Sequence, residues 1–152
     1  MTDRLSEHFT WAEATRSSTA DRLGISNRPD AKALDAILET AQAMEAVRSL
    51  FGKPVTVTSW YRSKPVNEAV GGSPTSAHVS GRAVDFRISG FTPVEIATRI
   101  AASPLMFDQI ILYGNRLHIG WADPKGARPD RRELLTRVSG GYKPGLHPED
   151  AI

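Results

Sequence analysis

The sequence lacks several features that would narrow its function at once. It has no cysteine among 152 residues, so disulfides and thiolate metal sites are excluded, and a metal ion could be held only by His, Asp or Glu. It has no run of about 20 apolar residues, so no membrane-spanning helix is predicted. The net charge is only +2, without the dense basic stripe typical of nucleic-acid-binding proteins. We therefore expect no nucleic-acid partner and no insertion into a membrane.

The first residues, MTDRLSEHFTWAE, also lack the apolar segment of a secretion signal. We expect a protein made in the cytoplasm without a signal peptide. A role in the cell wall or periplasm would then require another route, such as release from the cell or transport in a phage particle. The length suits a single domain with a sizeable core, and we expect a monomer.

The pattern of apolar residues predicts both helices and strands. The strongest helical period spans residues 31–51, and Gly52 ends it. A second helix is predicted from Thr92, as N-cap, to residue 103, with Pro93 at its first position. Alternating β-branched and aromatic residues predict strands at 55–60 and 82–88, a hairpin at 107–121 and a further strand near 132–138.

The stretch SAHVSGRAVDFRI places a carboxylate inside a predicted strand. Alternation of side chains turns Asp85 away from the core. The same rule, applied to RLHIGW, turns His118 to that non-core face if the two strands share a sheet. His78 precedes Asp85 across a loop in which Gly81 permits a turn back over the sheet. Two imidazoles and one carboxylate on one face form a three-ligand set for zinc with an open fourth position.

A structural alternative stays open on these residues alone. A single histidine is more often a hydrogen-bonded residue than a metal ligand, and Asp85 has Arg82 and Arg87 nearby as ion-pair partners. With the metal reading, the predicted fold is α+β: a small antiparallel sheet with helices packed on one face and a zinc site on the other. One domain covers residues 1–152, and 123–152 form a partly extended, loose tail.

Three motifs occur in an order that adds to this reading. Residues 76–85 match S-x-H-x-x-G-x-A-x-D, and FDQIILYGNRLHIGW ends in a His followed by a small residue and an aromatic one. TSWYRS and NEAVGGSPTSAH precede them. This set resembles the zinc D-Ala-D-Ala carboxypeptidase and L-Ala-D-Glu endopeptidase family of peptidoglycan peptidases. The opening LSEHFTWAEATRSSTA is similar to small phage and prophage members, and the resemblance extends from residue 5 to about 122.

The resemblance implies a function and a set of site residues. It implies a zinc-dependent peptidase that hydrolyses an amide bond in the stem peptide of bacterial peptidoglycan, as a carboxypeptidase or endopeptidase in wall lysis or remodelling. Zinc would be held by His78, Asp85 and His118, and Arg62 would face the developing oxyanion. Candidates for hydrogen bonds to the substrate are Asn67, Ser76 and Gln109.

The sequence departs from the family at the general base. Relatives generally carry a Glu or His a few residues before the last zinc ligand, whereas residues 109–117 contain neither. A two-residue turn at Gly114 and Asn115 pairs Ile111 with His118, which puts Gln109 and Tyr113 on the zinc face and Asp108 on the core side. Tyr113 is therefore the best-placed proton donor or oxyanion partner. Asp108 stays an alternative if the register differs, and His8 or His147 could enter from the termini.

Two other functions compete with a peptidase. A protein that kept the fold and zinc but lost the chemistry would be a wall-binding or structural module. An unrelated α+β domain with a chance motif would bind no zinc at all. Release of soluble fragments from purified peptidoglycan separates the first two readings, and bound zinc separates both from the third.

Overall fold

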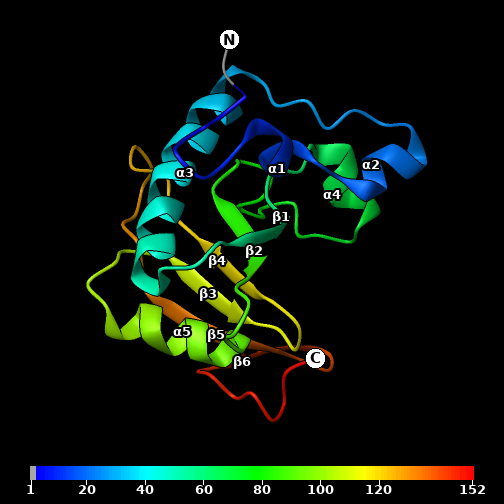
Figure 1. The fold of residues 1–152 in the computed structure, drawn as a ribbon. Helices are drawn as coiled ribbons and strands as arrows, with labels where there is room; N and C mark the ends of the chain where they lie inside the picture. Colours follow the sequence, from blue (N-terminus) through cyan, green and yellow to red (C-terminus); the bar gives the residue numbers. More distant parts are fainter. Residues whose placement is uncertain (1–2) are drawn as a thin grey trace.

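The computed structural model describes residues 3–152, and this part of the chain forms five helices and one six-stranded sheet (Figure 1). The strand order across the sheet is β1-β2-β4-β3-β5-β6. In chain order the elements are α1 (Trp11–Thr15), α2 (Ser18–Leu23), α3 (Ala31–Phe51), β1 (Thr56–Ser59), α4 (Lys64–Ala69), β2 (Ala83–Arg87), α5 (Pro93–Ala102), β3 (Gln109–Leu112), β4 (Leu117–Gly120), β5 (Glu133–Val138) and β6 (Gly141–Pro144).

The α+β class is confirmed, but the sheet is mixed, so the prediction of a purely antiparallel sheet is wrong. β5 runs parallel to β3, while the other neighbouring strands are antiparallel. The connection 121–132 leaves β4 at the end of the sheet where β3 begins, and it stays at that end. The chain therefore enters β5 beside the first residue of β3 and must run in the same direction.

The C-terminal segment continues the sheet beyond the region of resemblance. β5 aligns with the whole of β3, and β6 folds back on β5 as a hairpin. The last residues return to the sheet, because the backbone N–H of Ile152 donates to the carbonyl of Arg137 and the N–H of Gly114 donates to the carbonyl of Ile152. Residues 133–152 thus build one side of the sheet.

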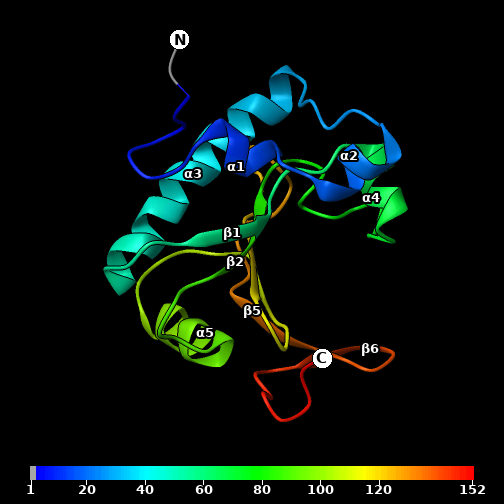
Figure 2. The same ribbon diagram turned by 45° about the vertical axis from the view of Figure 1, so that its right-hand side comes forward.

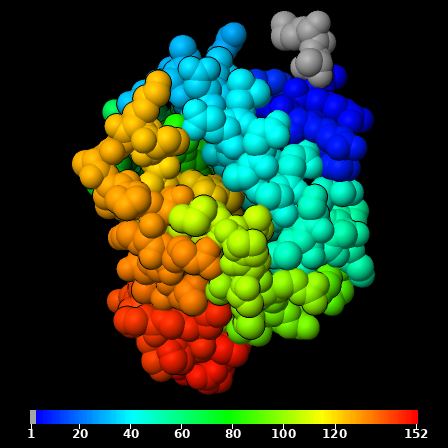
Figure 3. All heavy atoms as spheres, turned by 90° about the vertical axis from the view of Figure 1, so that its left-hand side faces the viewer, coloured from blue at the N-terminus to red at the C-terminus, as the bar shows by residue number. Residues whose placement is uncertain are grey.

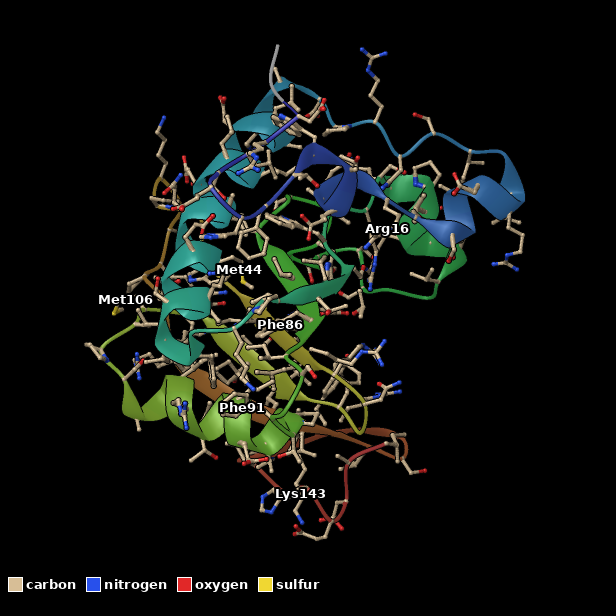
Figure 4. All side chains as sticks on the ribbon, in the orientation of Figure 1. Arg16, Met44, Phe86, Phe91, Met106 and Lys143 are labelled. Carbon is tan, nitrogen blue, oxygen red and sulfur yellow. The ribbon has the colours of Figure 1, made fainter. Side chains whose placement is uncertain are left out.

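The two longer helices, α3 and α5, lie on one face of the sheet, and the other face is left without a covering helix beside its centre (Figure 2). The space-filling view from the left-hand side of Figure 1 shows α3 and α5 next to each other, with the segment that contains β5 beside α5 (Figure 3). Between them and the sheet lies the core, where Met44 of α3 and Phe86 of β2 are both fully buried (Figure 4). No helix in residues 3–152 has the length and apolar character needed to cross a membrane.

Helix α3 begins and ends where the sequence predicts. The Asp30 side chain accepts a hydrogen bond from the backbone N–H of Ala33, and Gly52 closes the helix in the left-handed conformation at φ 64°. Leu38 belongs to the apolar period of this helix but is 41% exposed. The preceding turn of the helix buries the small side chains of Ala33 and Ala36. Their small size lets the loop that leads into β2 approach the helix backbone.

Helix α5 also follows its sequence signals. Thr92 and Glu95 form a capping box, and Pro93 occupies the first turn. The helix packs over β3 and β4 through Ile96, Ala97 and Ile100, which are all fully buried. It therefore supports the hairpin that carries His118 from the side opposite to the site.

Candidate metal centre

Asp85 and His118 face each other on adjacent strands. Asp85 of β2 is directly opposite His118 of β4, and Ile111 of β3 is opposite His118 on the other side. The neighbours of Asp85 in β2, Val84 and Phe86, are fully buried in the core. The alternation and the hairpin register deduced from sequence are therefore confirmed, and they bring a carboxylate and an imidazole together on the helix-free face.

His78 reaches the same point from the loop before β2. The loop turns at Gly81, whose φ of 80° lies in the left-handed region and whose added Cβ would meet Ile37 of α3 at 2.8 Å. The Gly81 carbonyl accepts hydrogen bonds from Thr40 and from the indole of Trp60. These contacts fix the loop against the core and hold His78, which is 2% exposed, over the sheet.

The three side chains converge on one small volume. His78 Nε2 lies 3.1 Å from Asp85 Oδ1, and His118 Nδ1 lies 2.8 Å from the same oxygen. All three residues are buried, and their ligand atoms lie within 4.8 Å of one another. Neither Arg82 nor Arg87 pairs with Asp85 in the described residues; the ion-pair partners of Asp85 are the two histidines and the arginines Arg62 and Arg116.

The hydrogen bonds of His78 determine which of its two ring nitrogens carries the proton. Its Nδ1 lies 2.5 Å from the backbone carbonyl of Trp60, which can only accept, so Nδ1 carries the proton. In a neutral ring Nε2 is then a lone pair, and it points at a carboxylate oxygen that is also an acceptor. Only a proton or a cation between them relieves this contact.

Burial favours the cation over the proton. Burial lowers the pKa of His78, against the raising effect of Asp85, so the ring tends to be neutral at neutral pH. Burial would raise the pKa of Asp85, but its interactions with the His78 and His118 rings outweigh burial and hold the pKa well below its usual range. A neutral imidazole and an ionised carboxylate are the forms that bind a metal ion. These three residues therefore fit a divalent cation such as zinc.

Two arginines stand on the other oxygen of the carboxylate. Arg62 Nη2 lies 3.8 Å and Arg116 Nε lies 3.5 Å from Asp85 Oδ2. Sequence reasoning selected Arg62 and missed Arg116, although Arg116 precedes His118 by two residues and alternation places it on the same face. The structure thus surrounds the ligand set with positive charge on its open side, where an anion would be stabilised.

Tyr113 lies on the site face, one residue beyond the end of β3. Its backbone N–H donates to the carbonyl of Arg116, and the Arg116 guanidinium stacks on its ring at 4.0 Å. Burial raises the pKa of Tyr113 to about 12, and Tyr142 and Asp85 add to the effect. At neutral pH the hydroxyl therefore keeps its proton and can donate a hydrogen bond but cannot serve as a base.

Asp108, the other candidate for the general base, is held by two arginines. It lines the cleft described below, just before β3, where alternation no longer decides the direction of a side chain. Arg128 and Arg131 donate to both of its oxygens. Burial would raise its pKa, but these hydrogen bonds outweigh burial and lower it to about 2. Its lone pairs and charge are used by the two arginines, so it is not available as a general base.

The structure gives different positions to the three predicted substrate-binding residues. Gln109 and Ser76 line the cleft; Gln109 donates to Glu133, and the Ser76 hydroxyl accepts from the backbone N–H of His78. Asn67 is 2% exposed and does not line the cleft. Its amide accepts from Arg62 and donates to the carbonyl of Ser73, so Asn67 positions Arg62 rather than contacting a substrate.

A cleft of about 1310 Å³ opens over the site on the helix-free face of the sheet. Eight Lys or Arg residues and four Asp residues line it, so it concentrates the small positive charge of the chain. The basic residues are Lys32, Arg62, Lys64, Arg82, Arg116, Arg128, Arg131 and Arg137. The terminal histidines stay outside it: His8 binds Glu45, and His147 binds the carbonyl of Pro144.

The comparison with protein families decides the assignment. The family model described as Peptidase M15 matches residues 7–120. The chain belongs to the peptidase M15 family. A search of curated proteins finds no match to it. M15 peptidases are zinc-dependent, which agrees with the buried group of His78, Asp85 and His118 that could bind a metal ion.

The M15 match contains His78, Asp85 and His118, together with Arg62 and Tyr113. It ends at Gly120, the last residue of β4. The strands β5 and β6 lie beyond it, yet Arg137 and Tyr142 from these strands line the same cleft. Part of the cleft is therefore built by a segment outside the family match.

Proposed function

We propose that this M15 peptidase hydrolyses an amide bond in the stem peptide of bacterial peptidoglycan, in wall lysis or remodelling of the phage or prophage type, with His78, Asp85 and His118 as its zinc ligands. The observation that carries the proposal is their convergence at the floor of a basic cleft. Membership in the M15 family supports a zinc-dependent peptidase with a peptidoglycan substrate at the level of class. The stem peptide is anionic through its free carboxylates, which suits the charge of the cleft.

Zinc at this site would lower the pKa of a bound water towards about 7 and polarise the scissile carbonyl. The residues of the chain then have separate tasks. Arg62, held by Asn67, places a guanidinium beside the ligand set where negative charge grows on the carbonyl oxygen. Tyr113, at the turn of the β3–β4 hairpin that also carries His118, offers a protonated hydroxyl. Trp60 fixes the His78 tautomer through its carbonyl.

One observation favours a second candidate function, a zinc-containing module that binds the wall without cutting it. Apart from Asp85, each carboxylate that lines the cleft in the described residues already has a partner. Asp30 caps α3, Asp108 is held by two arginines, and Asp123 accepts from the N–H of Lys125. In the part of the chain that the structure describes, no carboxylate is therefore left free beside the ligand set to take a proton from water.

The experiment that separates the two uses zinc-loaded protein and purified peptidoglycan. A peptidase releases soluble peptides or amino acids, identified by mass spectrometry of a defined muropeptide digest, and a chelator stops the release. A binding module sediments with the peptidoglycan and releases nothing. The mass of the fragment also identifies the bond, as D-Ala-D-Ala, L-Ala-D-Glu or a cross-bridge.

Our proposal for its cellular setting follows from the same reading. The protein is made in the cytoplasm, acts as a monomer and reaches the wall after release or as part of a phage particle. Fractionation of producing cells and sizing of the purified protein would test this proposal.

A further inference from the structure

The sheet register shows that the site face carries two neighbouring rows of side chains. The first row crosses the strands through Asp85, His118, Ile111 and Leu135, which are opposed in pairs. Two residues further along each strand is a second row, displaced by about 7 Å. Its members on β4, β5 and β6 and at the end of β3 are Arg116, Tyr113, Arg137 and Tyr142.

The second row joins residues from both sides of the family boundary. Arg137 is directly opposite Tyr142, and its guanidinium stacks on the Tyr142 ring at 5.0 Å. Arg116 stacks on Tyr113 at 4.0 Å in the same way. Each guanidinium lies over an aromatic ring, and its hydrogen bonds within the protein use only part of its five N–H donors, so the others can face a ligand.

The charges of this row are not balanced within the protein. In residues 3–152 no carboxylate lies within ion-pair distance of Arg137, whose guanidinium donates a hydrogen bond to the carbonyl of Gly141. Arg116 and Arg62 share Asp85, which the metal also needs. By contrast, Arg128 and Arg131 at the other end of the cleft are neutralised by Asp108.

We propose that Arg137 and Arg116, with Tyr142 and Tyr113 beneath them, form a subsite that binds the carboxylate on the α-carbon of the amine that leaves during hydrolysis. This subsite deepens the proposed function and rests on it for the identity of the substrate. A bidentate guanidinium matches a carboxylate in shape and charge. The half-exposed ring of Tyr142, 53% accessible, offers a surface for the adjoining carbon atoms.

The position of the row fits this chemistry. In both D-alanyl-D-alanine and L-alanyl-γ-D-glutamyl peptides, a free carboxylate lies three bonds from the scissile carbonyl carbon. A carbonyl held over the metal row therefore places that carboxylate toward the adjacent row. An amide bond whose leaving amine continues the chain through its α-carbonyl lacks this group, and we expect it to be cut slowly.

The test uses pairs of peptides that differ only in this carboxylate. One pair is a stem pentapeptide ending in D-Ala-D-Ala and its C-terminal carboxamide. The other is L-Ala-γ-D-Glu and its α-carboxamide, L-Ala-D-isoglutamine. For the pair that zinc-loaded protein cuts, we expect Arg137→Gln to raise KM for the carboxylate by about 10-fold and to leave the carboxamide unchanged.

Matched variants keep the result interpretable. Arg137→Lys retains the charge without the fork and should recover part of the loss. Arg22→Gln removes an exposed arginine of α2 that lies outside the cleft and should change nothing. Zinc content and melting temperature confirm that each variant is folded and loaded.

The outcomes separate the subsite from the proposed function. If the wild type cuts both members of a pair equally well, or Arg137→Gln affects both equally, the subsite is overturned and the peptidase stands. If the wild type cuts neither pair, binding of the same peptides is measured by calorimetry. A preference for the carboxylate that Arg137→Gln abolishes then supports the subsite in a protein that is not a peptidase, and equal binding of carboxylate and carboxamide overturns both.

Discussion

Two buried carboxylates on the same sheet, Asp85 and Asp108, have opposite surroundings. Asp108 receives hydrogen bonds on both oxygens from Arg128 and Arg131, so its charge and its lone pairs are satisfied within the protein. Asp85 has two imidazoles on one oxygen and two guanidiniums at 3.5 and 3.8 Å on the other, and the neutral His78 ring turns a lone pair, not a proton, toward it. The comparison shows that burial alone does not mark a functional carboxylate. A functional carboxylate is indicated by a contact such as that of Asp85 Oδ1 with His78 Nε2, which is favourable only with a proton or a cation between the two atoms.

The largest expected effect is on zinc binding. Asp85→Asn removes the charged ligand and should lower zinc affinity by about 10²-fold or more, since even partners of ligands contribute 10- to 100-fold. Asp108→Asn should leave zinc content unchanged. Metal analysis after dialysis against a weak chelator measures both. Equal loss in the two variants would remove the distinction between the carboxylates.

The next largest effect is expected on turnover, where Arg62 beside Asp85 and Arg128 beside Asp108 should differ. Arg62→Ala should lower turnover by about 10²-fold with zinc content unchanged, because it removes a cation aimed at the developing oxyanion. Arg128→Ala weakens only the Asp108 clamp and should leave turnover near the wild-type value. Steady-state rates on the muropeptide that is cut provide the measurement. A normal rate for Arg62→Ala would return this residue to a structural role.

A smaller effect is expected at Tyr113. Tyr113→Phe removes one hydrogen-bond donor while the ring under Arg116 remains, so we expect turnover to fall by about 10-fold without loss of stability. The raised pKa of Tyr113 predicts that this loss is the same across neutral pH. If instead Asp108→Asn abolished turnover in a zinc-loaded protein, Asp108 would be the base despite its clamp.

The smallest effect concerns acid stability. The pKa of Asp108 is about 2 in the folded protein against an ordinary 3.8, so its stabilising contribution is complete above 3.8 and is lost as the pH falls through about 2. Because the two arginines are half-exposed, we expect this contribution to be only about 1 kcal/mol. The difference in unfolding free energy between wild type and Asp108→Asn should therefore shrink between neutral pH and pH 2.

The control for the acid experiment is Asp35→Asn, at an exposed position on α3. Its difference from the wild type should stay constant over the same range of pH. A wild-type advantage over Asp108→Asn that persists unchanged at pH 2 would show that the arginine clamp is not responsible.

Local rules were sufficient for the part of the site that lies on neighbouring strands. Alternation and a two-residue turn predicted that Asp85 and His118 would share a face, and the caps of α3 and α5 predicted their ends. The partner of Asp108 was not predictable, because Arg128 and Arg131 lie in a connection without a regular period. The parallel pairing of β5 with β3 was hidden for a similar reason: it depends on the path of residues 121–132, which no local pattern encodes.

Arg137 and Tyr142 were missed as a consequence of that pairing. Arg137 lies in the strand predicted near 132–138, but its pairing partner was not predicted, and no element was predicted at Tyr142. Only the pairing with β3 brings them to the row beside the metal. Arg116, in contrast, could have been found, because it stands two residues before His118 in a strand whose alternation was already known.

Trp60 belongs to the hydrophobic core and also holds two parts of the metal site, and this links metal binding to the stability of the fold. Its indole ring is fully buried in the core beside Phe9, at a centroid distance of 6.0 Å, while its carbonyl holds the His78 ring and its N–H holds the turn at Gly81. The position of His78 is thus fixed by a residue of the hydrophobic core and not by a surface residue. Zinc that binds only the folded chain stabilises it by mass action. The free energy of unfolding should then rise with the concentration of the free ion.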